Sequence, residues 1–442
     1  MKYIKSLLLL LLSPLAFGQA SEPLSLSIDE AVSLALENNT TLKNAGLDIE
    51  YAEIQVNEIK AQGLPQVSGN FGFTHNYEVP TSIIPGDFVG QPGTTVSVQF
   101  GVPFTMQAGV GVNQLLFDGT FFLGLKAASE FVNISRLSAS KSEIDVKEAV
   151  IKAYYMAIIS DQNIVQLDES LKNIKKLKDE TQAMYDAGFA EKLDVDRLVL
   201  SVSNLEISIN QLQNQAKLAK QLLLNSIGLD VNQDVSLTTS SLPSEESALG
   251  ELSTTFNPEN RIEMKMLNQQ QELNELSLKR YKVGYLPSLF GNFNYGGNTF
   301  APQGSFSTLG DEWFGLGSYG LSLNVPIFDG QYKKAKMDQV KIDMEKTENT
   351  KEQTVLGMNL QVNQAKINYL NALKSIELQK KSKELAESIY KTTSIKFKEG
   401  VGSSFEMINA ESELTSARTN YLNVLYELNV AQIDLKKALG TL

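Results

Sequence analysis

The 442-residue sequence contains no cysteine and only one histidine, His75. The absence of cysteine excludes disulfides, thiolate metal sites and cysteine nucleophiles, and we expect no lipid anchor attached through a cysteine. A single histidine leaves little scope for histidine-based catalysis, and its neighbours Phe73 and Tyr77 indicate a structural residue on a strand. We therefore expect neither a cofactor nor a bound metal.

Long apolar runs and basic patches are also scarce. Beyond the N-terminal stretch there is no run of about 18 apolar residues, so we expect no helix that spans a bilayer. The net charge is −12 with scattered acidic residues, which argues against nucleic acid as a partner. No nucleophile–base pair, metal cluster or phosphate-binding loop is found, so the sequence does not indicate an enzyme.

The first residues have the features of a secretory signal peptide. Lys2 and Lys5 precede an apolar stretch at 7–12, and Ala16-Phe17-Gly18 fits a small-x-small cleavage site. We expect residues 1–18 to be the signal peptide.

The most informative feature is an internal repeat. Three landmarks occur twice in the same order, at Leu64-Pro65 and Leu286-Pro287, at Phe117-Asp118-Gly119 and Phe328-Asp329-Gly330, and at Tyr185 to Gly188 and Phe397 to Gly400. The copies are separated by 287 − 65 = 222, 328 − 117 = 211 and 400 − 188 = 212 residues. We therefore expect a first repeat at 19–227, a linker or equatorial segment at 228–257 and a second repeat at 258–442.

Each repeat is expected to begin with a helix followed by two strands. Ser27 and Glu30 form a capping-box pattern, which predicts a helix from there towards Lys60 with a break near Asn38. Alternating apolar and polar residues predict strands at 66–77, 105–117, 288–299 and 316–328. These segments have the length that a tilted transmembrane strand needs, and the segment between the first two is predicted to be a loop.

Long helices are expected after each Phe-Asp-Gly. The 188 − 118 = 70 residues from Asp118 to Gly188 contain no proline, and as a helix they would span about 100 Å. The returning segments carry apolar residues spaced 4-3-4-3-4-3-4, at Leu198, Val202, Leu205, Ile209, Leu212, Ala216, Ala219 and Leu223. Adding 212 to each number gives Ala410, Leu414, Ala417, Tyr421, Val424, Leu428, Ala431 and Leu435. Such seams are typical of antiparallel coiled-coil helices.

A four-stranded sheet in lipid would require several chains. Its two edges would leave N–H and C=O groups without partners, which costs several kcal/mol per group. Two chains would give eight strands and a barrel filled by side chains, whereas three would give twelve strands with room for a lumen. A soluble antiparallel coiled coil would explain the seams but would leave the strand pairs unexplained.

The sequence resembles the TolC family of outer-membrane efflux proteins over nearly all of the mature chain. The matching features are the opening segment 26–32, the paired Leu-Pro and Phe-Asp-Gly motifs, the paired helix turns and the ending at 438–442. The resemblance implies a mainly α protein with a membrane β part, internally duplicated. Its long antiparallel coiled-coil helices would form an α-barrel continuous with a 12-stranded β-barrel, four strands per chain, in a homotrimer.

The resemblance also implies a function and partners. The chain would be the outer-membrane exit duct of a tripartite efflux or type I secretion system, with a long periplasmic extension. It would conduct exported solutes passively from an inner-membrane pump, through a periplasmic adaptor (membrane fusion) protein, and it would contact outer-membrane lipid. The alternative is a periplasmic coiled-coil adaptor or binding protein without a pore.

The resemblance places the periplasmic tip, or gate, at the two helix turns that contain Tyr185 and Gly188, and Phe397 and Gly400. A glycine there permits the positive φ of a tight helix end. By the same matching, Asp194 is a gate-linking residue of the first hairpin. The triplets Phe117-Asp118-Gly119 and Phe328-Asp329-Gly330 are expected to be strand-to-helix junctions.

The second hairpin departs from the family pattern. Glu406 and Asn409 take two positions at which the family has aspartates, Gly402 replaces an arginine, and Phe397 replaces a tyrosine. We therefore hypothesise a ring of three Glu406 carboxylates that favours cations, closed more by packing of Phe397 than by ion pairs. The alternative is that Glu406 is a solvated surface residue beside a turn.

Overall fold

The computed structural model describes residues 24–239, 242, 252, 255–301 and 306–442. The expected signal peptide at 1–18 and part of the predicted linker lie outside these residues. The chain divides into two compact units. One, which we call the helical unit, comprises Met1–Lys43, Ser142–Asn257 and Met358–Leu442, and the other, the sheet unit, comprises Asn44–Lys141 and Pro258–Gly357. Each unit therefore takes segments from both predicted repeats.

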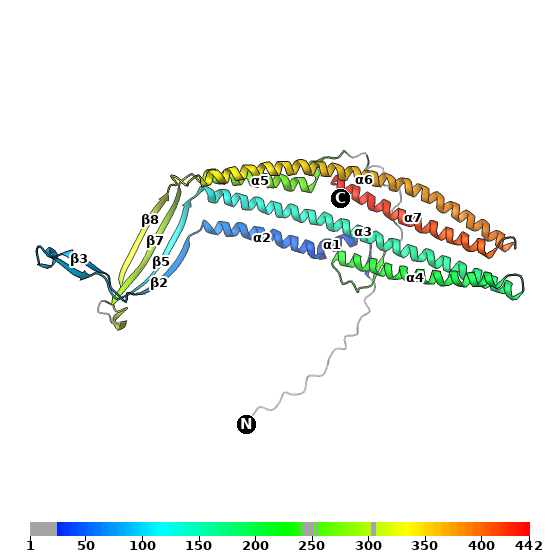
Figure 1. The fold of residues 1–442 in the computed structure, drawn as a ribbon, viewed down its shortest axis with the longest axis horizontal. Helices are drawn as coiled ribbons and strands as arrows, with labels where there is room; N and C mark the ends of the chain where they lie inside the picture. The colour runs from blue at the N-terminus through cyan, green and yellow to red at the C-terminus, as the bar shows by residue number, and fades with distance from the viewer. Residues whose placement is uncertain (1–23, 240–241, 243–251, 253–254, 302–305) are drawn as a thin grey trace, which may run out of the picture. The chain divides into compact units, whose positions relative to one another are not determined.

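The sheet unit contains the four expected strands in one antiparallel sheet (Figure 1). They are β2 (Gln66–His75), β5 (Phe104–Phe117), β7 (Ser288–Ala301) and β8 (Phe314–Asn324), in the order β2-β5-β7-β8. The pairing of β5 with β7 joins the two repeats, and β2 and β8 are the end strands.

The two faces of this sheet differ in chemistry. One row of paired residues contains Val67, Val112, Phe293 and Tyr319, and the next row contains Ser68, Gly111, Asn294 and Ser318. Because side chains alternate between the faces of a sheet, the first row lies on one face and the second on the other. Val67, Phe293 and Tyr319 of the first row are exposed, Tyr319 to 90%, and Val112 is half-buried. An exposed apolar face opposite a polar one is typical of a membrane sheet.

Two strand predictions were wrong. The predicted loop after β2 contains a hairpin of β3 (Thr81–Pro85) and β4 (Thr95–Gln99), joined through the 3-10 helix η1 (Gly86–Val89). The short strands were not predicted because the prolines and glycines of this segment are typical of a loop. The other error is the end of β8, which lies at Asn324 rather than Phe328. Pro326 follows shortly after Asn324, and a proline has no N–H with which to extend the ladder.

The helices agree with the sequence patterns. They are α1 (Ile28–Asn38), α2 (Thr40–Gln62), α3 (Gly119–Asp186), α4 (Lys192–Ile227), α5 (Ile262–Val283), α6 (Tyr332–Lys398) and α7 (Ser404–Leu439), besides the 3-10 turns η4 (Pro258–Asn260) and η5 (Phe306–Thr308). The capping box of Ser27 and Glu30 is present, and the break between α1 and α2 falls at Asn39. Within the described residues, none of the helices combines the length and hydropathy needed to cross a bilayer.

The predicted seams form part of the packing of the helical unit. On α4 the buried seam residues are Leu198, Ile209, Ala216, Ala219 and Leu223, and on α7 they are Ala410, Leu414, Leu428, Ala431 and Leu435. The main core also takes in the sheet of β1 (Leu24–Leu26) and β6 (Val235–Leu237), which are parallel. Tyr154 of α3 is fully buried there and donates a hydrogen bond to the carbonyl oxygen of Leu26 over 2.9 Å.

Candidate functional site

The turn after α3 is a Schellman motif. Gly188 has φ = 80°. Its N–H donates to the carbonyl oxygen of Tyr185 over 2.9 Å, and the N–H of Phe189 donates to that of Met184 over 2.8 Å. These two bonds satisfy carbonyl groups that the end of a helix would otherwise leave free.

The turn after α6 repeats this motif. Gly400 has φ = 73°. Its N–H donates to the carbonyl oxygen of Phe397, and the N–H of Val401 donates to that of Lys396, each over 3.0 Å. The aromatic residues Tyr185 and Phe397 therefore have the same backbone role. A Cβ at either glycine would have no neighbour within 4 Å, so the requirement for glycine is conformational and not one of space.

The returning helices begin differently. The hydroxyl of Ser403 caps α7 by accepting a hydrogen bond from the N–H of Glu406 over 3.2 Å. The corresponding residue before α4 is Glu191, whose side chain makes no capping hydrogen bond. The backbone of the two turns is thus shared, while the helix caps are not.

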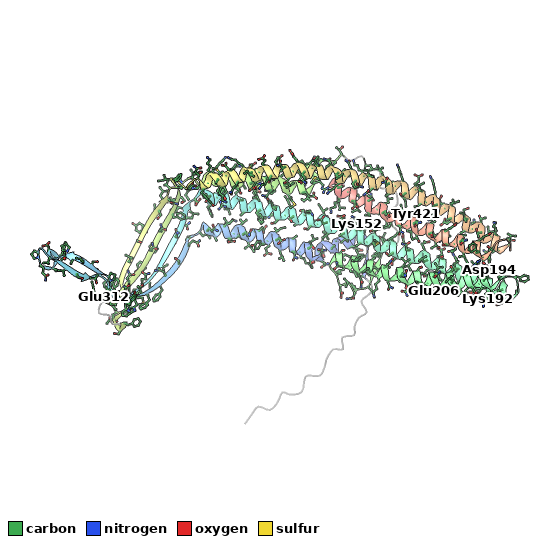
Figure 2. All side chains as sticks on the ribbon, viewed as in Figure 1. Lys152, Lys192, Asp194, Glu206, Glu312 and Tyr421 are labelled. Atoms are coloured by element: carbon green, nitrogen blue, oxygen red, sulfur yellow. The ribbon has the colours of Figure 1, made fainter. Side chains whose placement is uncertain are left out.

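Asp194 connects the two hairpins of the chain. Its Oδ1 accepts a hydrogen bond from the hydroxyl of Ser404 over 2.8 Å, and Ser404 is only 5% exposed. Asp194 is labelled beside the turn in Figure 2. Sequence reasoning selected Asp194 but missed Ser404. The only available signal was a second serine beside Ser403 at the start of the helix.

Apolar packing also joins the helices that make this link. Ile174, Leu177, Leu198 and Met407 form a small buried cluster, and Phe397 packs against it, partly buried. In addition, the guanidinium of Arg197 lies 5.2 Å from the centre of the Phe405 ring, a cation–π contact between α4 and α7.

The two remaining gate candidates are not part of this cluster. Glu406 and Asn409 are exposed, and among the described residues neither side chain has a hydrogen-bond or ion-pair partner. The structure of one chain therefore brings together Asp194, Ser404, Phe397 and their neighbours, but it does not bring Glu406 into that group.

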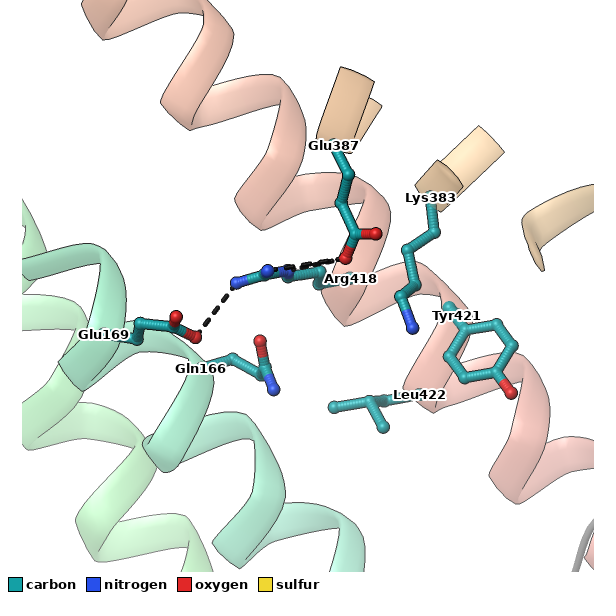
Figure 3. Close-up of a pocket in the computed structure, with 7 residues that line it drawn as sticks. All are labelled: Gln166, Glu169, Lys383, Glu387, Arg418, Tyr421 and Leu422. Carbon is teal, nitrogen blue, oxygen red and sulfur yellow. Dashed lines mark hydrogen bonds and ion pairs between the residues drawn. The ribbon is translucent and has the colours of Figure 1, made fainter. Parts of the chain in front are cut away.

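Farther along the helical unit, α3, α6 and α7 line a small open pocket of about 160 Å³ (Figure 3). The guanidinium of Arg418 forms ion pairs with the carboxylates of Glu169, over 3.0 Å, and Glu387, over 3.4 Å. Lys383 lies 4.9 Å from the ring centre of Tyr421. The guanidinium of Arg418 is thus paired with two carboxylates, and the ammonium of Lys383 lies against an aromatic ring, which indicates a cross-link between the helices.

A buried carboxyl lies between the same helices. Glu411 of α7 is 3% exposed, and its Oε2 has no hydrogen-bond partner among the described residues. Burial raises the pKa of Glu411, and hydrogen bonding with Ser170, Asn173 and Tyr390 offsets only part of that effect. Burial and the neighbouring Glu411 raise the pKa of Tyr390 to about 12.

The two strand-to-helix junctions differ. Phe117 ends β5 at a register irregularity, and Asp118 Oδ1 accepts hydrogen bonds from the N–H and the hydroxyl of Thr120, both over 2.7 Å. A Cβ at Gly119 would lie 2.1 Å from Val283 Cγ1, so a larger residue there would require the side chain of Val283 to move.

The second junction is not a direct exit from a strand. Phe328 lies beyond the end of β8 and is 83% exposed. Asp329 Oδ2 accepts hydrogen bonds from the N–H and the ammonium of Lys333, both over 3.1 Å, and Gly330 has φ = 67°. The aspartate keeps its role at the helix start, but the expected continuity of strand and helix holds only at Phe117-Asp118-Gly119.

These features define a duplicated protein with a membrane-type sheet and two long helical hairpins. Within the described residues, no group of three or more acidic or histidine side chains is placed to hold a metal ion. The chain belongs to the outer membrane efflux protein family, whose sequence model matches residues 31–229 and 259–441. It is therefore an outer-membrane efflux duct protein and not an enzyme.

Known relatives match along most of their length. The chain is 23% identical to the cation efflux system protein CusC of Escherichia coli O157:H7 over 421 residues, which is 92% of this chain and 85% of CusC. It is 20% identical to the outer membrane protein TolC of Escherichia coli strain K12 over 459 residues, 99% of this chain and 87% of TolC. A crystal structure of CusC aligns with a TM-score of 0.73 at 16% identity, over 93% of this chain and 91% of that one. The last similarity shows a shared fold.

Proposed function

We propose that three copies of this chain close a twelve-stranded barrel in the outer membrane, with their long helices continuing it as an α-barrel. The observation that supports this most is the open sheet β2-β5-β7-β8, whose end strands β2 and β8 need partners and whose one face is apolar. Three chains supply 3 × 4 = 12 strands, enough for a lumen.

The proposed activity is passive conduction of exported solutes that an inner-membrane pump delivers through a periplasmic adaptor protein. Membership of the outer membrane efflux family supports this assignment. The adaptor would meet the hairpin turns at Gly188 and Gly400, and the cargo would be chosen mainly by the pump.

We propose further that the hairpin turns form the gate. The Asp194–Ser404 hydrogen bond and the packing of Phe397 would hold the two hairpins of one chain together. Glu406, exposed and free of intrachain partners among the described residues, is available to form a ring with its copies in the trimer.

Bilayer conductance tests this proposal. We expect detergent-extracted protein to form cation-preferring channels and Glu406→Gln to reduce that preference, while the control Glu399→Gln, also near the turn, leaves it unchanged. Unaltered selectivity in Glu406→Gln would reject the ring. A protein that stays in the soluble fraction after lysis and forms no channels would favour the adaptor alternative.

A further inference from the structure

The four-stranded sheet of β2, β5, β7 and β8 contains no Asp, Glu, Lys or Arg on either face. All four lie within the described residues, and His75 is their only titratable side chain apart from tyrosines. Lipid explains the absence of charge on the apolar face. It does not explain the opposite face, because the inner face of a membrane barrel is polar and accommodates charged side chains.

Amides, hydroxyls and glycines make up most of that opposite face. Three successive rows on this face show the pattern: Asn70, Gly109, Gly296 and Leu316, then Ser68, Gly111, Asn294 and Ser318, and then Gln66, Asn113, Asn292 and Gly320. Leu316 is the one apolar side chain of these rows. Such groups donate and accept hydrogen bonds but carry no net charge, so they solvate cations and anions alike.

The amide side chains on this face lie across glycines of the neighbouring strand. A Cβ at Gly72 would lie 2.8 Å from Gln107 Nε2, one at Gly109 would lie 3.1 Å from Asn70 Oδ1, and one at Gly111 would lie 3.0 Å from Asn294 Oδ1. Asn292 also donates a hydrogen bond to the hydroxyl of Ser322 over 2.8 Å. Because these three glycines have no side chain, the amides of the neighbouring strands can pack directly against their backbone.

We propose that this face lines a section of the duct that does not sort solutes by charge. The proposal rests on the proposed function and adds a substrate class to it: this section admits cations, anions and neutral solutes alike, and any charge preference arises outside the strands. In a trimer each charged residue would appear three times around the lumen, so its absence from all four strands removes a strong filter.

The absence of native cysteine makes single-cysteine labelling a direct test. In the full-length channel in lipid, Asn294→Cys is exposed to a cationic and to an anionic methanethiosulfonate reagent, and each rate is divided by that of a free thiol. We expect the two normalised rates to agree within about threefold, as an uncharged lining requires. Phe293→Cys, on the apolar face, is the matched control and is expected to remain unlabelled.

A second variant calibrates the sensitivity of the test. Ser318→Asp, added to Asn294→Cys, puts one carboxylate beside the thiol in the same row. We expect it to favour the cationic reagent by about fivefold or more. A comparable bias without the added aspartate overturns the inference, as does labelling of Phe293→Cys in place of Asn294→Cys. Absence of conductance in the unmodified channel contradicts the proposed function itself.

Discussion

The two hairpin turns share a backbone but use equivalent residues differently. Asp194 and Glu406 occupy the same place in the two repeats, since 406 − 194 = 212, the separation of the two turn glycines. Asp194 is bonded to Ser404 of the other hairpin, whereas Glu406 is exposed. The first repeat thus uses its carboxylate to join the hairpins, whereas the second leaves its carboxylate exposed, as the proposed ring of Glu406 requires.

A similar difference occurs five residues farther along. Glu411 of the second repeat corresponds to Val199 of the first, since 411 − 212 = 199. The charged residue is 3% exposed and the apolar one 47% exposed. The duplication therefore preserved positions at which the backbone requires a particular residue, while the side chains around them diverged according to their neighbours.

The shared backbone is tested by replacing the turn glycines. Gly188→Val and Gly400→Val each place a β-branched residue at positive φ, and we expect each to lower the free energy of unfolding by about 2–3 kcal/mol. Gly357→Ala, within α6 with no neighbour near its Cβ, is the control and is expected to be neutral or stabilising. Thermal unfolding in detergent measures all three. Tolerance of valine at only one turn would show that the turns are not equivalent.

The link made only by the first repeat is tested by Asp194→Ala. It leaves the buried hydroxyl of Ser404 without its acceptor, and we expect a loss of about 1–2 kcal/mol and a larger resting conductance. The matched change in the second repeat is Glu406→Ala, for which we expect no loss of stability. Equal destabilisation by the two substitutions would remove the proposed asymmetry.

The difference in helix caps predicts a smaller effect. Ser403→Ala removes the hydroxyl that accepts the N–H of Glu406, and we expect a loss of about 1 kcal/mol. Glu191→Ala, at the equivalent position of the first repeat, makes no capping bond to lose, so its unfolding midpoint should match that of the parent protein.

The buried Glu411 predicts a dependence on pH. Because its pKa is raised in the folded chain, the folded state retains a proton that the unfolded state loses, so stability falls as pH rises from the ordinary value of 4.5 through the folded pKa. Glu411→Gln has no carboxyl to ionise, so its stability should not fall in this way as pH rises. We expect its free energy of unfolding to exceed that of the parent protein by about 0.5 kcal/mol at pH 8 and by less at pH 4.5. The exposed Glu413→Gln is the control. An unchanged pH profile in Glu411→Gln would mean that the carboxyl is hydrated in the assembled protein.

The sequence predicted features that depend on neighbouring residues. The capping box at Ser27, the turn glycines Gly188 and Gly400 and the heptad seams all follow from spacing within one element, and the structure confirms them. Features that depend on distant partners were missed. The Ser404 hydroxyl donates to Asp194, 210 residues away in sequence, and β1 pairs with β6 from the segment that was predicted to be a linker. The hairpin of β3 and β4 was missed because its strands are only five residues long and lie in a segment rich in proline and glycine, which are typical of turns.

The mass of the detergent-solubilised particle tests the central claim most directly. An open sheet with an apolar face requires copies of itself in lipid, so native mass spectrometry should find three chains per particle, dependent on detergent or lipid. A monomer that remains dissolved in water after the detergent is removed would contradict the account.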